Sequence, residues 1–161
     1  NPAITPISPA DWKTYTNEDF NFSIRYPGYI SISQTYWNLT DNNVEKKFSV
    51  FSFSNPLLEY PWDMTIIARK ITEENFLAGL RGTIDSPESN CQELLISEAK
   101  IKVFKCQGKT DEGHIAPIQF LLFNKGTEYR INSGYEILEN KDYILEEVLI
   151  HDKMIQTLKL F

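Results

Sequence analysis

The chain has 161 residues, the size of one ordinary domain, and its 16 Lys and Arg against 22 Asp and Glu give a formal charge of −6 at pH 7. This acidic balance argues against a non-specific nucleic-acid binder and against a basic membrane-surface patch. Hydrophobic residues make up 42% of the chain and aromatic residues 13%, a composition that excludes global disorder.

The first eleven residues, NPAITPISPAD, predict an extended tether. Three prolines among small residues leave this segment without the hydrophobic mass to fold by itself. We therefore expect a flexible tether over residues 1–11 and a single domain over residues 12–161. A start at Asn1 fits a mature chain from which a signal segment was removed, or a truncation. The longest uninterrupted apolar run is Phe120–Phe123, so no segment reaches the ~20 apolar residues that a transmembrane helix needs.

Alternating apolar and polar residues predict strands through the first half of the chain. The alternation over Phe20–Tyr26 ends at Pro27 and resumes at Ile30. Lys47–Ser54 and Met64–Lys70 have the same period and predict two further strands. Together these segments favour an antiparallel meander.

Residues 72–82 predict a short helix. Thr72 can cap its N-terminus, and Gly82 is expected just past its C-terminus. The segment that follows, up to Asn90, is expected to be a polar loop. The apolar face of the helix is expected to comprise Phe76, Leu77 and Leu80.

The two cysteines, Cys91 and Cys106, flank a predicted β-hairpin. Gln92–Ile96 and Lys100–Phe104 are rich in strand-forming residues, and a polar corner separates them midway between the cysteines. Directly opposed Cα atoms in antiparallel strands lie about 4.5 to 5.5 Å apart, within the range that a disulfide requires. We therefore expect a disulfide between the two cysteines. The alternative is two unrelated buried thiols in a reducing cytosol.

The second half of the chain predicts another hairpin, a helix and a last strand. Pro117–Phe123 and Thr127–Ile131 are separated by the tight-turn sequence Asn124-Lys125-Gly126. From Asp142 the period changes to that of an amphipathic helix, and Thr157–Phe161 alternates again. About eight or nine strands and two helices favour an α+β fold, a twisted antiparallel sheet with two or more helices packed on it.

Signals for catalysis are few. The sequence has no serine-hydrolase elbow, no zinc-protease motif, no phosphate-binding glycine loop and no C-x-x-C. His151, with Asp152 beside it, is expected on the solvated surface of the last helix. Asp111, Glu112 and His114 could approach a cation, but an ordinary polar loop is the favoured interpretation. We therefore expect no catalytic residue, no metal and no cofactor.

Trp37, Tyr60 and Trp62 are the candidate partner-binding residues. They lie in or beside predicted loops, with Tyr36 next to Trp37, and large aromatic residues in loops are typical of recognition surfaces. The alternative is that Trp37 and Trp62 fold back and cap the ends of the sheet.

Both ends of the chain resemble the PsbP-like proteins and small bacterial lipoproteins related to them. Residues 12–28, with Tyr26-Pro27 at the end of the first strand, are similar to the family's opening pattern. Met154–Phe161 is similar to its final helix running into a short strand. The resemblance implies a PsbP-like α/β/α sandwich in an extracytoplasmic compartment, on a lipid-anchored tether whose anchor lies upstream. It implies no catalytic residues.

We therefore expect a non-catalytic binding or assembly module, the membrane-tethered soluble part of a bacterial lipoprotein at the cell surface or in the periplasm. Its expected partner is an unknown protein or glycan of the cell envelope, and the chain is expected to be a monomer. One alternative is a small envelope hydrolase that uses carboxylates near His114 or His151. Another is a purely structural spacer, which would bind no partner saturably.

Overall fold

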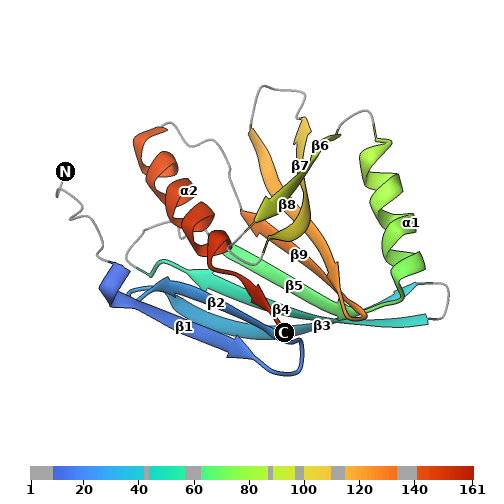
Figure 1. Cartoon of the computed structure of the whole chain (residues 1–161), viewed down its shortest axis with the longest axis horizontal. Coiled ribbons are helices and arrows are strands. Elements are labelled where there is room, and N and C mark those ends of the chain that lie inside the picture. The colour runs from blue at the N-terminus through green and yellow to red at the C-terminus, as the bar shows by residue number, and fades with distance from the viewer. Residues whose placement is uncertain are drawn as a thin grey trace.

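The computed structural model describes residues 9–41, 44–56, 63–86, 89–96, 100–109, 115–133 and 141–161 (Figure 1). Residues 1–8 of the expected tether lie outside this part, and Pro9–Asp11 form a short 3-10 helix. The strands are β1 (Trp12–Asn17), β2 (Phe22–Pro27), β3 (Ser31–Asp41), β4 (Val44–Ser54), β5 (Met64–Lys70), β6 (Ser89–Ile96), β7 (Ile101–Lys109), β8 (Ile115–Asn124), β9 (Thr127–Ser133) and β10 (Lys159–Leu160). The helices are α1 (Glu73–Ile84) and α2 (Lys141–Gln156).

The strands form two antiparallel sheets. The larger sheet has the order β3-β4-β5-β9-β8-β7-β6, and the smaller sheet has the order β1-β2-β10. After the meander β3–β4–β5 the chain crosses through α1 to the far edge of the larger sheet. It then returns strand by strand until β9 pairs with β5. The α+β class and the antiparallel sheet predicted from the sequence are confirmed.

The smaller sheet and α2 pack on one face of the larger sheet, which we call the core face (Figure 1). Side chains alternate between the two faces of a strand, so every second side chain of β4, β5 and β9 points to the core face. Full burial of a large apolar side chain stabilises a fold by roughly 1.5 to 3 kcal/mol. The largest fully buried members of this core are Phe22, Ile24, Phe51, Phe53, Met64, Ile66, Leu122, Tyr129, Ile131, Met154, Ile155 and Leu158.

Hydrogen bonds at β2 join the first strands to the last residues of the chain. The backbone N–H of Arg25 donates to Oγ1 of Thr157 at 2.8 Å, and the backbone N–H of Phe161 donates to the carbonyl of Asn21 at 3.1 Å. β10 also pairs with β2, which confirms the predicted closing strand.

Helix α1 covers the opposite face of the larger sheet, which we call the outer face. Phe76 and Leu80 are buried against Cys106 and Leu121 of β7 and β8. The ring of Phe76 stacks on Phe123 of β8 with 5.4 Å between the centroids. The helix therefore covers only the end of the outer face that is built by β6, β7 and β8.

The N-terminus of α1 is as predicted and its C-terminus is not. The side chain of Thr72 accepts a hydrogen bond from the backbone N–H of Asn75, which confirms the cap. The helix runs through Gly82 to Ile84, because one glycine in a helix interior costs only about 1 kcal/mol relative to alanine and does not end it. Leu77 is 41% exposed, so it does not belong to the buried face.

Both predicted hairpins are present, and the cysteine hairpin has the expected register. Cys91 lies directly opposite Cys106 in the β6–β7 ladder. β8 and β9 are joined by the two-residue turn Lys125-Gly126, with φ angles of 46° and 77°. Positive φ at both central residues is what a type I′ turn requires, and glycine adopts it without strain.

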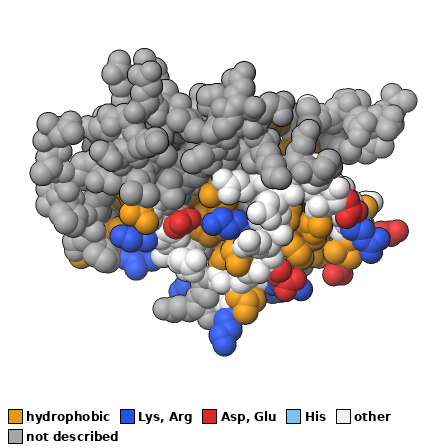
Figure 2. Space-filling model, turned by 90° about the horizontal axis from the view of Figure 1, so that it is seen from above, with side chains coloured by type: hydrophobic (Ala, Val, Ile, Leu, Met, Phe, Trp, Pro, Cys, Tyr) orange, Lys and Arg blue, Asp and Glu red, His pale blue; other side chains and the backbone are white. Residues whose placement is uncertain are grey.

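The surface gives two further findings. Among the described residues, no helix is both long and apolar enough to span a membrane. Figure 2 shows Lys and Arg side chains lying among Asp and Glu side chains over the described part of the visible face. That part of the surface therefore presents no broad patch of one charge sign.

Candidate functional site

The exposed aromatic residues of β3 form the first part of the candidate site. Tyr36 and Trp37 are 71% and 53% exposed, and they lie within a regular strand. The prediction that they lie in or beside loops is wrong, because this segment has no Gly or Pro to interrupt a strand. The exposure of Trp37 also does not support a role as a cap on the sheet. Tyr60 and Trp62 lie outside the described residues.

These aromatic residues lie on a projecting ribbon. β3 pairs with β4 along all 11 residues of each strand, whereas β4 pairs with β5 only from Ser49 to Phe53. From Phe48 toward its turn, the β3–β4 hairpin is therefore no longer paired with β5 (Figure 1), although Arg69 of β5 still lies over Phe48. We call residues 36–38 and 47–48 the ribbon. A two-stranded ribbon buries little surface, so side chains on both of its faces stay accessible.

A row of side chains crosses the outer face from the ribbon toward the centre of the sheet. Trp37 lies opposite Phe48 in the β3–β4 ladder. The guanidinium of Arg69, on β5, lies over the ring of Phe48 at 5.2 Å from its centroid. Arg69 lies opposite Glu128 of β9. We call Trp37, Phe48, Arg69 and Glu128 the cross-strand row, in which a cation on an aromatic ring is held by electrostatic attraction.

Glu128 is a buried carboxylate shared by two arginines. Its side chain is 4% exposed, and it accepts hydrogen bonds from Nε of Arg69 and, at 2.7 Å, from Nε of Arg130. Two positive charges against one negative charge leave one positive charge on this part of an acidic chain. Because a guanidinium has five N–H donors and the Arg130 side chain is 37% exposed, Arg130 can also bind an acidic or carbonyl group.

Uncharged polar side chains continue the outer face beside the cross-strand row. Nδ2 of Asn132 donates to Oγ1 of Thr65 at 3.3 Å, and Nε2 of Gln119 donates to Oδ1 of Asn132 at 2.9 Å. All three residues are half-buried. They give this face hydrogen-bonding capacity without additional charge.

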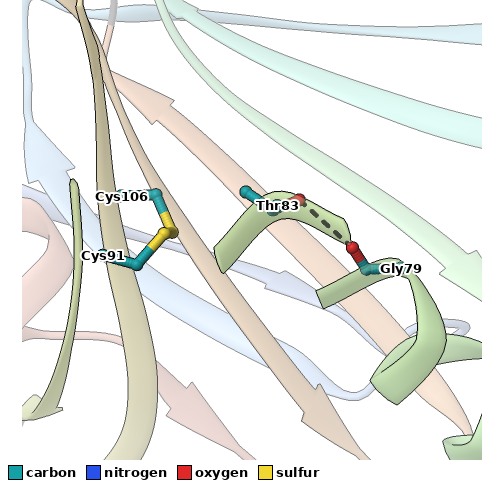
Figure 3. Close-up of a disulfide and its surroundings, with 4 residues drawn as sticks. All are labelled: Gly79, Thr83, Cys91 and Cys106. Atoms are coloured by element: carbon teal, nitrogen blue, oxygen red, sulfur yellow. Dashed lines mark hydrogen bonds between the residues drawn. A yellow bond between two sulfur atoms is a disulfide. The ribbon is translucent and has the colours of Figure 1, made fainter. Parts of the chain in front are cut away.

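The disulfide lies at the end of the outer face that α1 covers. The Sγ atoms of Cys91 and Cys106 are 2.11 Å apart, at bonding distance, which confirms the predicted juxtaposition. Figure 3 shows the bridge beside the part of α1 where Oγ1 of Thr83 donates to the carbonyl of Gly79. The bridge ties edge strand β6 to β7 where the helix packs, so its role in the site is to hold this end of the sheet together.

His151 is buried, so the prediction of a solvated position on the last helix is wrong. The residue is 0% exposed, and its Nδ1 lies 3.0 Å from Oγ of Ser133. Burial lowers the pKa of His151 from 6.5 to about 4, so the ring is neutral at pH 7. The predicted apolar stripe of this helix included Leu149 and Ile155. Ile155 is buried as expected, whereas Leu149 is 50% exposed and Met154 and His151 are buried instead.

The buried Ser133–His151 pair does not form an accessible hydrolytic site. Ser133 and His151 are 1% and 0% exposed, so a substrate has no path to them in this structure. Asp111, Glu112 and His114 lie outside the described residues. Over the described part of the chain, no three His, Cys, Asp or Glu side chains gather in a way that could hold a metal ion. The chemistry that the outer face offers is recognition through aromatic, cationic and amide groups.

Sequence reasoning identified Trp37 but missed the rest of the site. Arg69, Glu128 and Arg130 lie within predicted strands, but the sequence pattern alone assigns no role to their charges. The signal was the alternation itself, because these residues occupy the positions of β5 and β9 that do not face the core. The β5–β9 pairing that brings them together spans two predicted hairpins and has no local signature.

Comparison with known proteins supports the fold and goes no further. No family model matches the chain, and no curated protein matches it. The solution structure of cyanobacterial PsbP (CyanoP) from Synechocystis sp. PCC 6803 matches with a TM-score of 0.55 and 9% sequence identity. The match covers 99% of this chain and 98% of that chain. At this identity the likeness concerns the backbone arrangement alone, and we conclude that the chain has a PsbP-like fold.

Proposed function

We propose that this chain is a non-catalytic binding or assembly module that holds a partner protein at the ribbon and the cross-strand row. The observation that carries the proposal is the exposure of Tyr36 and Trp37, 71% and 53%, on strands with regular pairing. Scattered exposed apolar residues are common on proteins. An exposed Trp37 opposite the ring on which Arg69 stacks is different, with Tyr36 exposed on the other face of the same strand, because Trp, Tyr and Arg dominate binding energy at interfaces.

The arrangement also favours a rigid binding surface. Arg69 is held between the ring of Phe48 and the carboxylate of Glu128, so it loses little rotamer freedom when a partner binds. Trp37 supplies apolar contact area, and Arg130 supplies donors for an acidic or carbonyl group. The proposed partner surface is therefore apolar at its centre with an acidic group beside it. The PsbP-like fold is compatible with this role but does not identify the partner.

We further propose that the protein works in an oxidising compartment outside the cytoplasm. Disulfides such as Cys91–Cys106 persist in such compartments and are rare in reducing ones. Intact mass of the protein isolated from its own cells, with and without reductant, tests this: a gain of about 2 Da on reduction is expected from one bridge. Membrane attachment and a bacterial source remain expectations of the sequence.

Photo-crosslinking in the cells that make the protein tests the binding surface. A photoreactive residue in place of Tyr36 is expected to give one discrete adduct with another protein. The matched control is the same residue in place of Leu95, which is apolar and 64% exposed on β6, at the other edge of the larger sheet. Adducts of equal yield at both positions would show that the ribbon has no special role.

The affinity of the purified partner for variants of this chain then measures how much Trp37 contributes to binding. Trp37→Ala is expected to weaken binding at least tenfold in calorimetric titration, as expected for an aromatic residue at the centre of an interface. Leu95→Ala should leave the affinity unchanged. If no saturable partner is found, the structural-spacer alternative replaces the binding module. Adducts with glycans alone would make a sugar the ligand.

A further inference from the structure

We propose that β3 pairs antiparallel with β3 of a second copy of this chain, which joins two larger sheets into one continuous sheet. The interaction uses the backbone edge of β3 and leaves the two faces of the ribbon accessible. It therefore goes beyond the proposed function and does not depend on it.

The outer edge of β3 is open. β3 is the first strand of the larger sheet, and among the described residues only β4 pairs with it. Of residues 31–38, all are exposed except Ile32, which is half-buried. An edge strand of this kind presents a row of backbone N–H and C=O groups that can pair with another strand.

This edge lacks the features that natural proteins use to prevent pairing. From Ile30 to Thr40 the sequence has no charged residue, no proline and no glycine. The eleven β3–β4 pairs also run without a bulge. Charges, prolines, bulges and very short strands are the usual protection of an edge.

The other three sheet edges have such protection. The β1 edge has the exposed Lys13, and β10 is two residues long with Lys159 exposed. The β6 edge has Glu93, whose carboxylate forms an ion pair at 2.8 Å with Lys102 of β7. Of the four edges among the described strands, the β3 edge alone has no charge over a long stretch, residues 31–40, and this contrast indicates that β3 is suited to pairing.

A second copy is the occupant that fits an uncharged edge best. Antiparallel pairing of a strand with itself creates a two-fold axis, and a neutral strand brings no like charges together across that axis. Pairing over eight residues would span about 27 Å and close about eight backbone hydrogen bonds. The net charge of −6 on each copy opposes association at a distance, so higher ionic strength should strengthen the dimer.

Sedimentation velocity from about 1 to about 300 µM tests the proposal, because a small interface of this type fits a Kd on the order of 10 µM. The wild-type chain is expected to shift from monomer to dimer over this range. Thr35→Lys places a charge at the centre of the edge and should leave only monomer. Gln92→Lys makes a charge change at an exposed position of the β6 edge and should leave the dimer intact.

Hydrogen exchange at low and high protein concentration provides a second measurement that does not depend on a variant. Amides of β3 should gain protection at high concentration, while those of β6 should not.

If circular dichroism shows that Thr35→Lys does not fold, Ser33→Lys takes its place. A wild-type chain that stays monomeric throughout, or equal dissociation by both lysine variants, would overturn the proposal. A monomer that still gives a partner adduct at position 36 would overturn the dimer alone.

Discussion

Glu128 shows how one buried residue organises an accessible surface. Its carboxylate, 4% exposed, accepts hydrogen bonds from two arginines that reach it from β5 and from its own strand. Removal of one partner from such a cluster leaves desolvated charge without compensation, which costs more than the intact interaction contributes. The position of Arg69 over Phe48 therefore depends on a side chain that is itself almost inaccessible from the surface.

Glu128→Gln is expected to lower the free energy of unfolding by about 2 kcal/mol, because two guanidinium groups lose their shared counter-charge. Arg130→Gln should cost only about 0.5 kcal/mol, since its side chain is 37% exposed and water replaces the lost interaction. Urea unfolding of the two variants at pH 7 measures the difference. Equal losses would mean that Glu128 is not held as the structure shows.

His151 leads to a prediction about pH. Its pKa is about 4 in the folded chain and 6.5 when unfolded, so the unfolded state binds the proton more readily. The stabilising effect of the neutral buried ring is therefore complete above pH 6.5 and is lost as the pH falls toward 4. The full loss corresponds to about 3 kcal/mol.

Urea unfolding at pH 7.5 and 4.5 tests the titration of this residue. His151→Asn removes the titrating group but keeps a polar side chain near Ser133. The wild type should lose about 2 kcal/mol more than this variant between the two pH values. A variant that loses as much as the wild type would assign the pH dependence to other groups.

At the scale of the element, α1 shows that a local capping signal and packing against the sheet determine different properties of a helix. The cap at Thr72 and the buried pair Phe76 and Leu80 fix where the helix begins and which face it buries. Its glycines do not end it: a Cβ added at Gly79 or Gly82 would meet nothing within 4 Å. These glycines therefore weaken the helix without serving a turn.

Gly82→Ala is expected to stabilise the protein by about 0.5 to 1 kcal/mol, because alanine loses less backbone entropy in a helix interior. Gly126→Ala is the matched control and should destabilise, since its φ of 77° belongs to the left-handed region. Thermal unfolding of both variants gives the two signs. Destabilisation by Gly82→Ala would place the helix C-terminus at Gly82, as the sequence alone predicts.

For the whole molecule, the disulfide and α1 act on the same end of the larger sheet. Cys106 is buried with Phe76 and Leu80, so the bridge stabilises both the β6–β7 hairpin and the surface on which the helix lies. The other end of the sheet, with the ribbon, has no such cross-link among the described residues. The cross-linked end and the proposed binding surface thus lie toward opposite edges of one sheet.

The double variant Cys91→Ala with Cys106→Ala should lower the free energy of unfolding by about 3 kcal/mol, the entropy effect of closing a loop of this length. Urea unfolding compares it with the oxidised wild type. The reduced wild type should match the double variant within about 1 kcal/mol. A much smaller loss would mean that the β6–β7 hairpin is already ordered in the unfolded chain, so that the bridge removes little further entropy from it.

Local patterns in the sequence predict most of the helices and strands, but they do not predict which strands pair at long range. The turn at Lys125-Gly126 and the cap at Thr72 are set by neighbouring residues, so both could be predicted. The burial of His151 could not, because it depends on how α2 is rotated against strands far away in the chain. The sequence does not predict β1 as a strand, since half of its side chains are exposed and its apolar alternation is weak.

The candidate site follows the same division. Trp37 was identified because large aromatic residues are visible in any sequence, yet its place on a projecting strand was not. The contact between Arg69 and Glu128 requires β5 to lie beside β9, and about 60 residues separate these strands in the chain. Nothing in the sequence says that β3 is an edge strand, so the open edge became visible only with the sheet order.

The hydrogen bonds that join β2 to the last residues also have a consequence for folding kinetics. Phe22 and Ile24 cannot be fully buried before Met154 and Leu158 arrive from the far end of the chain. Such a contact, between Arg25 and Thr157 for example, closes a loop of nearly the entire domain, and loop closure on that scale is slow compared with hairpin formation. Newly made chains should thus pass through a period in which β1 and β2 are already paired but the C-terminal end of α2 does not yet shield them from water.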